Sequence, residues 1–258
     1  MTKQTPVQYL RLDGDDYIAY CKTNGKPNQP CVVFLGGFMS DMTGTKATSL
    51  ESHCIHKGYE YIRFDYMGHG QSSRRFIDGT IGLWHQNVLS VIDKLTDPKK
   101  PLILVGSSMG GWLMLLAALA RNNRVNAIVG IASAPDFTEE LIWNAMTSEQ
   151  QHILTNKGVF NLESEYGDEP YPITLALIDD GRNHLLLERN INIDVPVRLI
   201  HGEKDLDVPT NISQRLHNKL TSTDKKLVLV ENGDHRMSGE KELELLFELV
   251  DEVVKTTC

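Results

Sequence analysis

Cysteine is scarce in this sequence, and no segment is both long and apolar. The 258 residues include four cysteines, at Cys21, Cys31, Cys54 and Cys258, and no two of them have CxxC or metal-site spacing. This usage predicts reduced thiols rather than a disulfide framework, and no metal site is expected. No apolar run reaches the roughly 20 residues of a membrane span, so no transmembrane segment is expected either.

The sequence also has fewer basic residues than acidic ones. Lysine and arginine number 26 against 34 aspartate and glutamate residues, which leaves a net charge of −8. Without a basic cluster, binding to nucleic acid or to an anionic membrane surface is not expected. The first residues, MTKQTPVQYLRLDGDD, contain neither the apolar core of a secretory signal nor the Arg/Ser-rich pattern of a transit peptide. The sequence therefore predicts a cytoplasmic protein.

What the sequence does contain is a repeated alternation of short apolar runs and helical patterns. An N-terminal hairpin is expected from QYLRL and YIAYCKT. Continuous apolar runs, typical of strands buried on both faces of a parallel sheet, then occur in CVVFLGG, YEYIRFDY, PLILVGSS, NAIVGIAS, VPVRLIHG and KKLVLVEN. The helical patterns lie at about 44–57, 80–96, 109–121, 210–220 and 239–255. This order predicts an α/β fold with a mostly parallel central sheet and helices on both faces.

One interval interrupts this alternation. Between IASAP and VPVRLI, about sixty residues lack a buried-strand pattern but contain helix-like pieces. A structureless loop of that length is unusual in a compact domain. We therefore expect a helical cap, residues 138–194, inserted into a core that residues 1–137 and 195–258 form. The alternative is a helical insertion that packs separately and does not cover a functional site.

The stretch VGSSMGGW, residues 105–112, joins a predicted strand to a predicted helix. A phosphate loop needs a lysine after its glycines and a dinucleotide loop needs GxGxxG, and this stretch has neither. Its G-x-S-x-G spacing is typical of a nucleophile on a sharp turn, where the residues two before and two after the serine must lack side chains. Gly106 and Gly110 meet this need around Ser108, whereas the same frame centred on Ser107 would place two large side chains there. Ser108 is therefore the predicted nucleophile.

A serine nucleophile needs a base, and the base needs an orienting acid. In this architecture the chain order is serine, acid, histidine. The segment HGEKDLDVP follows a predicted strand and places Asp205 on the turn before a helix. Asp207 is the alternative acid, although its position before Val-Pro is typical of a helix cap. His201, at the end of the strand, is expected to brace the turn, and Asp205 is the predicted acid.

The predicted base is His235, in the turn ENGDHRM between the last predicted strand and the C-terminal helix. Most other histidines lie on helical patterns or in the cap. His69, in FDYMGHGQS, follows a strand and is the alternative. Chain order relative to Ser108 favours His235.

Acyl transfer also needs fixed N–H donors for the negative charge that develops on the carbonyl oxygen. One predicted donor is the amide of Met109, directly after the nucleophile. The second is the amide of Phe38, in VFLGGFMSD, where a glycine pair permits a tight turn after an early central strand. Substrate contacts are expected from the same loop and from the cap, at Gly37, Met39, Ile142, Trp143 and Ile178.

Together these motifs resemble the α/β-hydrolase family over nearly the whole chain. The resemblance lies in FLGGFMSD for the oxyanion loop, FDYMGHGQSS for a structural turn, and GSSMGGW, HGEKDLDVP and GDHRM for the nucleophile, acid and histidine motifs. Within the family, GGFMSDMTGTKA, GSSMGGWLMLLAA, DEPY and DHRM are similar to the branch of mitochondrial palmitoyl-protein thioesterases and acyl-glucuronide esterases. The resemblance implies hydrolysis of an ester or thioester with a long acyl or bulky aglycone part, and a mitochondrial location is implied by it alone.

The predicted activity is that of a serine esterase or thioesterase, a carboxylic ester hydrolase that forms an acyl-enzyme without cofactor or metal. The expected partner is a small-molecule or acylated substrate. A C–C bond hydrolase that uses the same three side chains is one alternative. A ligand sensor that keeps the scaffold without turnover is the other, and turnover of a p-nitrophenyl ester separates it from the enzyme.

Overall fold

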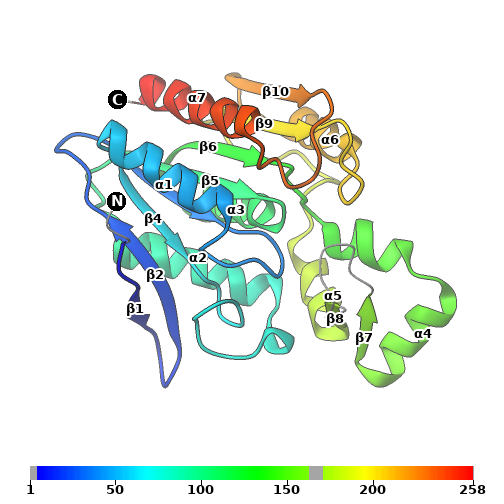
Figure 1. Cartoon of the computed structure of the whole chain (residues 1–258). Helices are drawn as coiled ribbons and strands as arrows, with labels where there is room; N and C mark the ends of the chain where they lie inside the picture. The colour runs from blue at the N-terminus through cyan, green and yellow to red at the C-terminus, as the bar shows by residue number, and fades with distance from the viewer. Residues whose placement is uncertain (1–4, 163–170, 258) are drawn as a thin grey trace.

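Eight strands form one sheet in the computed structural model, which describes residues 5–162 and 171–257 (Figure 1). The strand order is β1-β2-β4-β3-β5-β6-β9-β10. β1 and β2 form the predicted hairpin, β2 also pairs antiparallel with β4, and all other neighbours are parallel. The strands are β1 (Gln8–Arg11), β2 (Tyr17–Thr23), β3 (Cys31–Leu35), β4 (Glu60–Phe64), β5 (Leu102–Ser107), β6 (Val125–Ile131), β9 (Val197–Gly202) and β10 (Lys225–Val230).

Helices cover both faces of this sheet, which confirms the predicted fold class (Figure 1). One face carries α1 (Thr45–Lys57) and α7 (Glu240–Thr257); the other carries α2 (Ile81–Leu95), α3 (Met109–Ala120) and α6 (Thr210–Lys219). The central strands are mostly apolar because both of their faces are buried. In β3, for example, Val32 and Phe34 pack with α1 and α7, whereas Val33 and Leu35 pack with α2 and α3.

The parallel strands bring their carboxyl ends to one edge of the sheet. The loops after β3, β5, β9 and β10 all begin at this edge, so the predicted oxyanion loop, nucleophile, acid and base meet there (Figure 1). Open α/β sheets bind their ligands at this edge. Among the described residues, none of the helices has both the length and the apolar character needed to cross a membrane.

The segment between β6 and β9 contains the predicted cap, residues 138–194, here called the cap segment. It has the expected helical pieces, but also an antiparallel pair of strands that the sequence analysis did not predict, because each is only four residues long. Residues 168–170 of the DEPY motif lie outside the described residues. The elements are a π-helical turn (Thr138–Ile142), a 3-10 turn (Trp143–Ala145), α4 (Ser148–Lys157), β7 (Val159–Leu162), β8 (Tyr171–Thr174), α5 (Leu175–Gly181) and a second 3-10 turn (Arg182–His184).

The two ends of the cap segment are joined by a buried carboxylate. Asp136, two residues before the segment, accepts hydrogen bonds from the backbone amides of Leu186 and Leu187, with shortest distances of 2.8 Å. Asp136 has a φ of 60°, which an aspartate tolerates better than most residues. Asp136 is 2% exposed, and Leu186 and Leu187 are buried as well. Water therefore cannot replace the carboxylate as the acceptor for the two amides. This contact ties the chain just before the cap segment to its C-terminal part.

Replacing Asp136 by alanine is therefore expected to lower the free energy of unfolding by about 3 kcal/mol, because two buried N–H groups lose their acceptor. Asp97→Ala is the matched control, since Asp97 also accepts a backbone amide, from Lys99 at 2.9 Å, but is exposed. The control is expected to cost less than about 1 kcal/mol. Urea unfolding measures the stability of both variants. Equal losses of unfolding free energy would contradict the structural role assigned to the buried Asp136 carboxylate.

Candidate active site

Ser108 lies on a sharp turn between β5 and α3, with φ 54° and ψ −119°. Such backbone angles are strained for a residue with a side chain. The glycines around it are required by contact: a Cβ on Gly106 would lie 2.4 Å from the carbonyl oxygen of Gly110, and a Cβ on Gly110 would lie 2.1 Å from that of Leu35. The structure therefore places Ser108, and not the buried Ser107 at the end of β5, at the apex of the turn.

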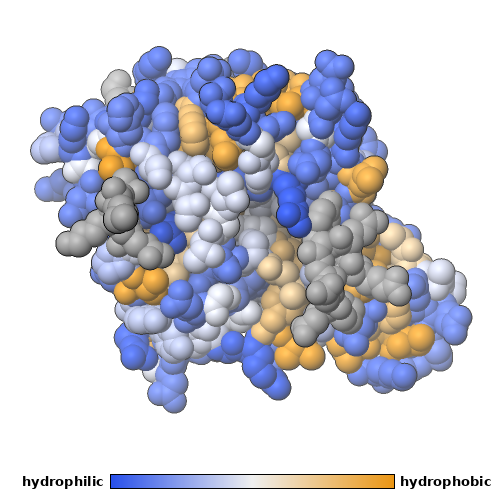
Figure 2. Space-filling model, in the orientation of Figure 1, coloured by the Kyte–Doolittle hydropathy of each residue, from blue (hydrophilic) through white to orange (hydrophobic). Residues whose placement is uncertain are grey.

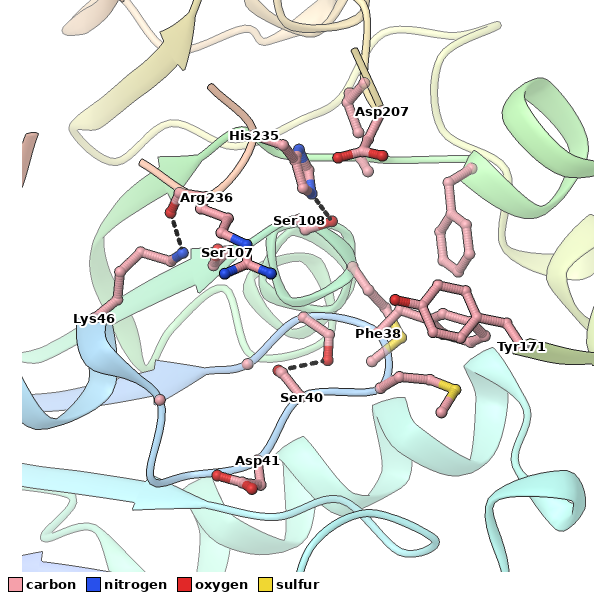
Figure 3. A pocket seen from close by; sticks show the side chains of 18 of the residues that line it. Phe38, Ser40, Asp41, Lys46, Ser107, Ser108, Tyr171, Asp207, His235 and Arg236 are labelled. Atoms are coloured by element: carbon pink, nitrogen blue, oxygen red, sulfur yellow. Dashed lines mark hydrogen bonds between the residues drawn. The ribbon is translucent and has the colours of Figure 1, made fainter. Parts of the chain in front are cut away.

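The three side chains predicted as nucleophile, base and acid are brought together, and Figure 3 shows Ser108 and His235 of this group. The Nε2 atom of His235 lies 3.0 Å from the Oγ of Ser108, and its Nδ1 lies 2.8 Å from the Oδ2 of Asp205. His235 comes from the turn after β10 and Asp205 from the turn after β9. In this arrangement Nδ1–H donates to the carboxylate and leaves Nε2 able to accept the proton of the serine hydroxyl.

The carboxylate of Asp205 is enclosed by hydrogen-bond donors. Its Oδ1 accepts from the backbone amides of Asp207, at 3.0 Å, and Val208, at 2.8 Å. Burial alone would raise the pKa of Asp205, but the hydrogen bonds from His201 and His235 outweigh it and hold this pKa well below its usual range. Asp205 is therefore the ionised acceptor, and the side chain of Asp207 lines the neighbouring cavity instead.

His201 supports the acid turn, as predicted from the sequence. Its side chain is fully buried, with Nε2 lying 3.1 Å from the Oδ2 of Asp205 and 2.8 Å from the carbonyl oxygen of Val208. Nδ1 lies 2.6 Å from the hydroxyl of Ser213 in α6. An Nε2–H tautomer satisfies all of these contacts, with the serine hydroxyl donating to Nδ1. Ser213 was not predicted, because nothing in its local sequence marks it.

His69, the alternative base, lies behind the oxyanion loop rather than beside the serine. Its Nε2 accepts from the amide of Met39 at 3.3 Å, and its ring packs edge-on against Tyr66, Phe76 and Trp84. Burial lowers the pKa of His69 to about 4, so the ring is neutral at physiological pH. The contact supports the loop at Met39, whose φ is 55°.

The loop after β3 lies directly against the nucleophile. A Cβ on Gly37 would be 3.5 Å from the Cβ of Ser108. The carbonyl oxygen of Gly37 is occupied within the loop, since it accepts from the hydroxyl of Ser40 at 2.8 Å. Among the described residues, the amides of Phe38 and Met109 donate to no other protein group. Both N–H groups are thus available to a substrate oxygen near Ser108.

A cavity of about 620 Å³ opens at Ser108 and His235. Its apolar side lies between the core and the cap segment, where Figure 2 shows apolar side chains gathered at the surface. The opposite side, toward α1 and the His235 turn, carries polar side chains (Figure 3). The apolar lining includes Phe38, Met39, Phe137, Leu141, Ile142, Leu162, Tyr171 and Ile173, and the polar lining includes Lys46, Arg236 and Ser238.

The structure corrects two of the five predicted substrate contacts. Gly37, Met39 and Ile142 line the cavity, but Trp143 and Ile178 do not. The ring of Trp143 lies under a guanidinium, 4.6 Å from the Cζ of Arg182. Ile178 is fully buried in the hydrophobic core. The π-helical turn that ends at Ile142 breaks the 3.6-residue period, so neighbouring side chains there do not follow the expected face.

Asp205, Asp207 and His235 place their ligand atoms within 4.8 Å of one another, as a metal site would. Both oxygens of Asp205 and both ring nitrogens of His235 already take part in other contacts of the site. The grouping follows from the serine–histidine–aspartate arrangement itself.

Comparison with known proteins gives consistent matches. The profile of the alpha/beta hydrolase fold matches residues 30–169. Human mitochondrial palmitoyl-protein thioesterase ABHD10 is 38% identical over 98% of this chain and 81% of its own length. The solved structure of alpha/beta hydrolase domain-containing protein 10 from mouse superposes with a TM-score of 0.90 at 36% identity, covering 98% of this chain and all of the mouse chain.

These relatives overturn one expectation from the sequence. The bovine, orangutan, human, rat and mouse palmitoyl-protein thioesterases that match nearly the whole chain are all mitochondrial by name. The prediction of a cytoplasmic protein is therefore wrong, and the finding points to mitochondria.

The glycine frame around Ser108 generates a stability prediction. Gly110→Ala is expected to lower the free energy of unfolding by about 3 kcal/mol or more, because the new methyl group meets backbone atoms that cannot give way. Gly44→Ala is the control: its Cβ would lie 3.5 Å from the carbonyl oxygen of Asp41, and its φ is −57°. The control is expected to stay within about 1 kcal/mol of wild type in urea unfolding. A Gly110→Ala protein as stable as the control would show that the turn is not sterically closed.

Proposed function

The chain belongs to the α/β-hydrolase family, and on this premise we propose that it hydrolyses carboxylic esters and thioesters through an acyl-enzyme on Ser108. The observation that carries the proposal is the unbroken hydrogen-bond chain from Ser108 through His235 to Asp205, with distances of 3.0 and 2.8 Å. It ends at a free cavity rather than in the core. A purely structural histidine–aspartate pair would not need a strained serine at its open end.

In the acylation step, His235 takes the proton of the Ser108 hydroxyl on Nε2 as Oγ forms a bond to the acyl carbon. The carbonyl π-bond breaks, and the resulting oxyanion accepts hydrogen bonds from the amides of Phe38 and Met109. Asp205, ionised and fixed by its own donors, stabilises the imidazolium at Nδ1. The carbonyl bond then re-forms and the bond between the acyl carbon and the leaving oxygen or sulfur breaks, while the imidazolium gives its proton to that atom, which departs as the alcohol or thiol.

Deacylation repeats these roles with water. His235 removes a proton from a water molecule that attacks the acyl carbon of the Ser108 ester, and the same two amides hold the second oxyanion. The proton returns to Oγ as the acid departs. Each oxyanion donor of this kind is typically worth about 10²–10³ in rate.

The lining of the cavity is the evidence for the acyl part of the substrate. Its apolar side is the surface that an alkyl chain would bury, and each buried methylene contributes about 0.8 kcal/mol. The human relative is named a palmitoyl-protein thioesterase. We therefore assign a long-chain acyl thioester or ester as the substrate class, with the acyl chain lying between the core and the cap segment. A mitochondrial compartment is part of this proposal.

The nucleophile assignment predicts an unequal pair of serine variants. Ser108→Ala is expected to lose about 10⁴-fold or more in kcat on a p-nitrophenyl ester, as in other triads. Ser107→Ala is the matched control, since it removes the neighbouring hydroxyl, and it should keep activity within about threefold. If wild type hydrolyses the ester no faster than Ser108→Ala, the enzyme proposal fails and the ligand-sensor alternative replaces it.

The acyl-site assignment predicts a change of chain-length preference. Leu141→Trp fills the apolar side of the cavity, so kcat/KM for a p-nitrophenyl palmitate should fall at least tenfold more than kcat/KM for the butyrate. Trp143→Phe, next to it but away from the cavity, should leave the ratio of the two unchanged. An unchanged ratio in Leu141→Trp would place the acyl chain elsewhere.

A further inference from the structure

Lys46 connects two parts of the site that are far apart in the sequence. It lies in the first turn of α1, which follows the loop that carries Phe38. Its Nζ donates to the backbone carbonyl oxygen of Arg236, directly after His235, and lies 3.5 Å from the hydroxyl of Ser238 (Figure 3). Lys46 thereby joins the element behind the oxyanion loop to the turn that carries the base.

The His235 turn also has contacts of its own, including a hydrogen bond at 2.9 Å from the amide of Lys204, after β9, to the carbonyl oxygen of Gly233. The amide of Met237 donates to the Oδ1 of Asp234 at 3.0 Å, and the side chain of Met237 is buried in the core. The hydroxyl of Ser238 donates to the carbonyl oxygen of Arg236 at 2.9 Å. The Lys46 ammonium adds a contact from α1.

Lys46 is half-buried at the edge of the cavity. Burial lowers its pKa to about 8, against the opposing attraction of Asp234 and together with the repulsion of Arg236. A partly buried ammonium is costly unless oxygens accept its protons. The carbonyl oxygen of Arg236 and the hydroxyl of Ser238 are such acceptors, so the placement of the ammonium depends on the position of the His235 turn, and the turn in return depends on it.

We propose that Lys46 is a positioning residue for hydrolysis, which keeps His235 in hydrogen-bond reach of Ser108 while the oxyanion loop stays in place. The proposal rests on the proposed function above. Because the base and one oxyanion donor sit on separate loops, catalysis requires the two loops to hold a fixed spacing. A displacement of about 1 Å in such a geometry can cost on the order of 10²-fold in rate.

Lys46 also lines the cavity, so it could instead bind an anionic part of a substrate. The two roles differ in what they change. Charge recognition affects KM, and only for charged substrates, whereas positioning of the base affects kcat for any substrate. A neutral, short ester such as p-nitrophenyl butyrate therefore isolates the positioning role.

The experiment compares Lys46→Met, Lys46→Arg, Lys57→Met, Ser108→Ala and wild type on p-nitrophenyl butyrate, with thermal midpoints recorded for each. Lys57→Met is the matched control, because Lys57 is in the same helix and has an ion pair with Asp251 at 2.6 Å, away from the cavity. Lys46→Met should lose at least tenfold in kcat with KM within threefold of wild type. Lys46→Arg should recover kcat to within about threefold, and Lys57→Met should match wild type.

Three results would overturn the proposal: wild-type kcat in Lys46→Met, a rise in KM alone, or equal losses of kcat in Lys46→Met and Lys57→Met. If Lys46→Met does not fold, Lys46→Gln replaces it in the same comparison. Failure of the proposed function gives a different pattern, because wild type would then be no faster than Ser108→Ala. If wild type is active, Ser108→Ala is inactive and Lys46→Met is fully active, the proposed role of Lys46 is rejected while the proposed function stands.

Discussion

The strained turn at Ser108 is the constraint to which the rest of the site is adjusted. Every backbone group of this residue is occupied: its N–H donates to the carbonyl oxygen of Ile131, at 2.9 Å, and its own carbonyl accepts from the amides of Gly111 and Ala134. The left-handed backbone therefore cannot relax without breaking hydrogen bonds to β6 and α3. With the backbone fixed in this way, the side chain is directed away from the sheet, toward the loops that follow the other strands.

Those loops differ in how firmly they are held. The acid turn is held at the carboxylate of Asp205, which accepts from backbone amides on one oxygen and from His201 and His235 on the other. The base turn is fixed by Met237 in the core and, in our proposal, by Lys46 from α1. The cap segment is joined to the core at its ends by Asp136. The catalytic edge is thus set by the core, while the cap segment provides one wall of the cavity.

Much of this could be predicted from the sequence, because the causes are local. The glycine frame that selects Ser108 depends on residues two positions away, and the apolar runs and helix patterns give element bounds within a few residues of those observed. Other features have causes that are not local. The Lys46 contact joins residues 190 positions apart, and the short strands β7 and β8 lack a buried pattern. The π-helical turn leaves Ile142 at the cavity but places Trp143, predicted to share its role, outside the cavity lining.

The central claim is that the reaction passes through an ester on Ser108. The most direct measurement is to mix the protein with a palmitoyl thioester, stop the reaction in acid within the first turnover, and locate the acyl group by peptide mass spectrometry. We predict a palmitoyl group on Ser108, not on Ser107, which disappears at later times as free palmitate accumulates. Palmitate formed at full rate with the acyl group on another residue, or on none at any time, would contradict the account.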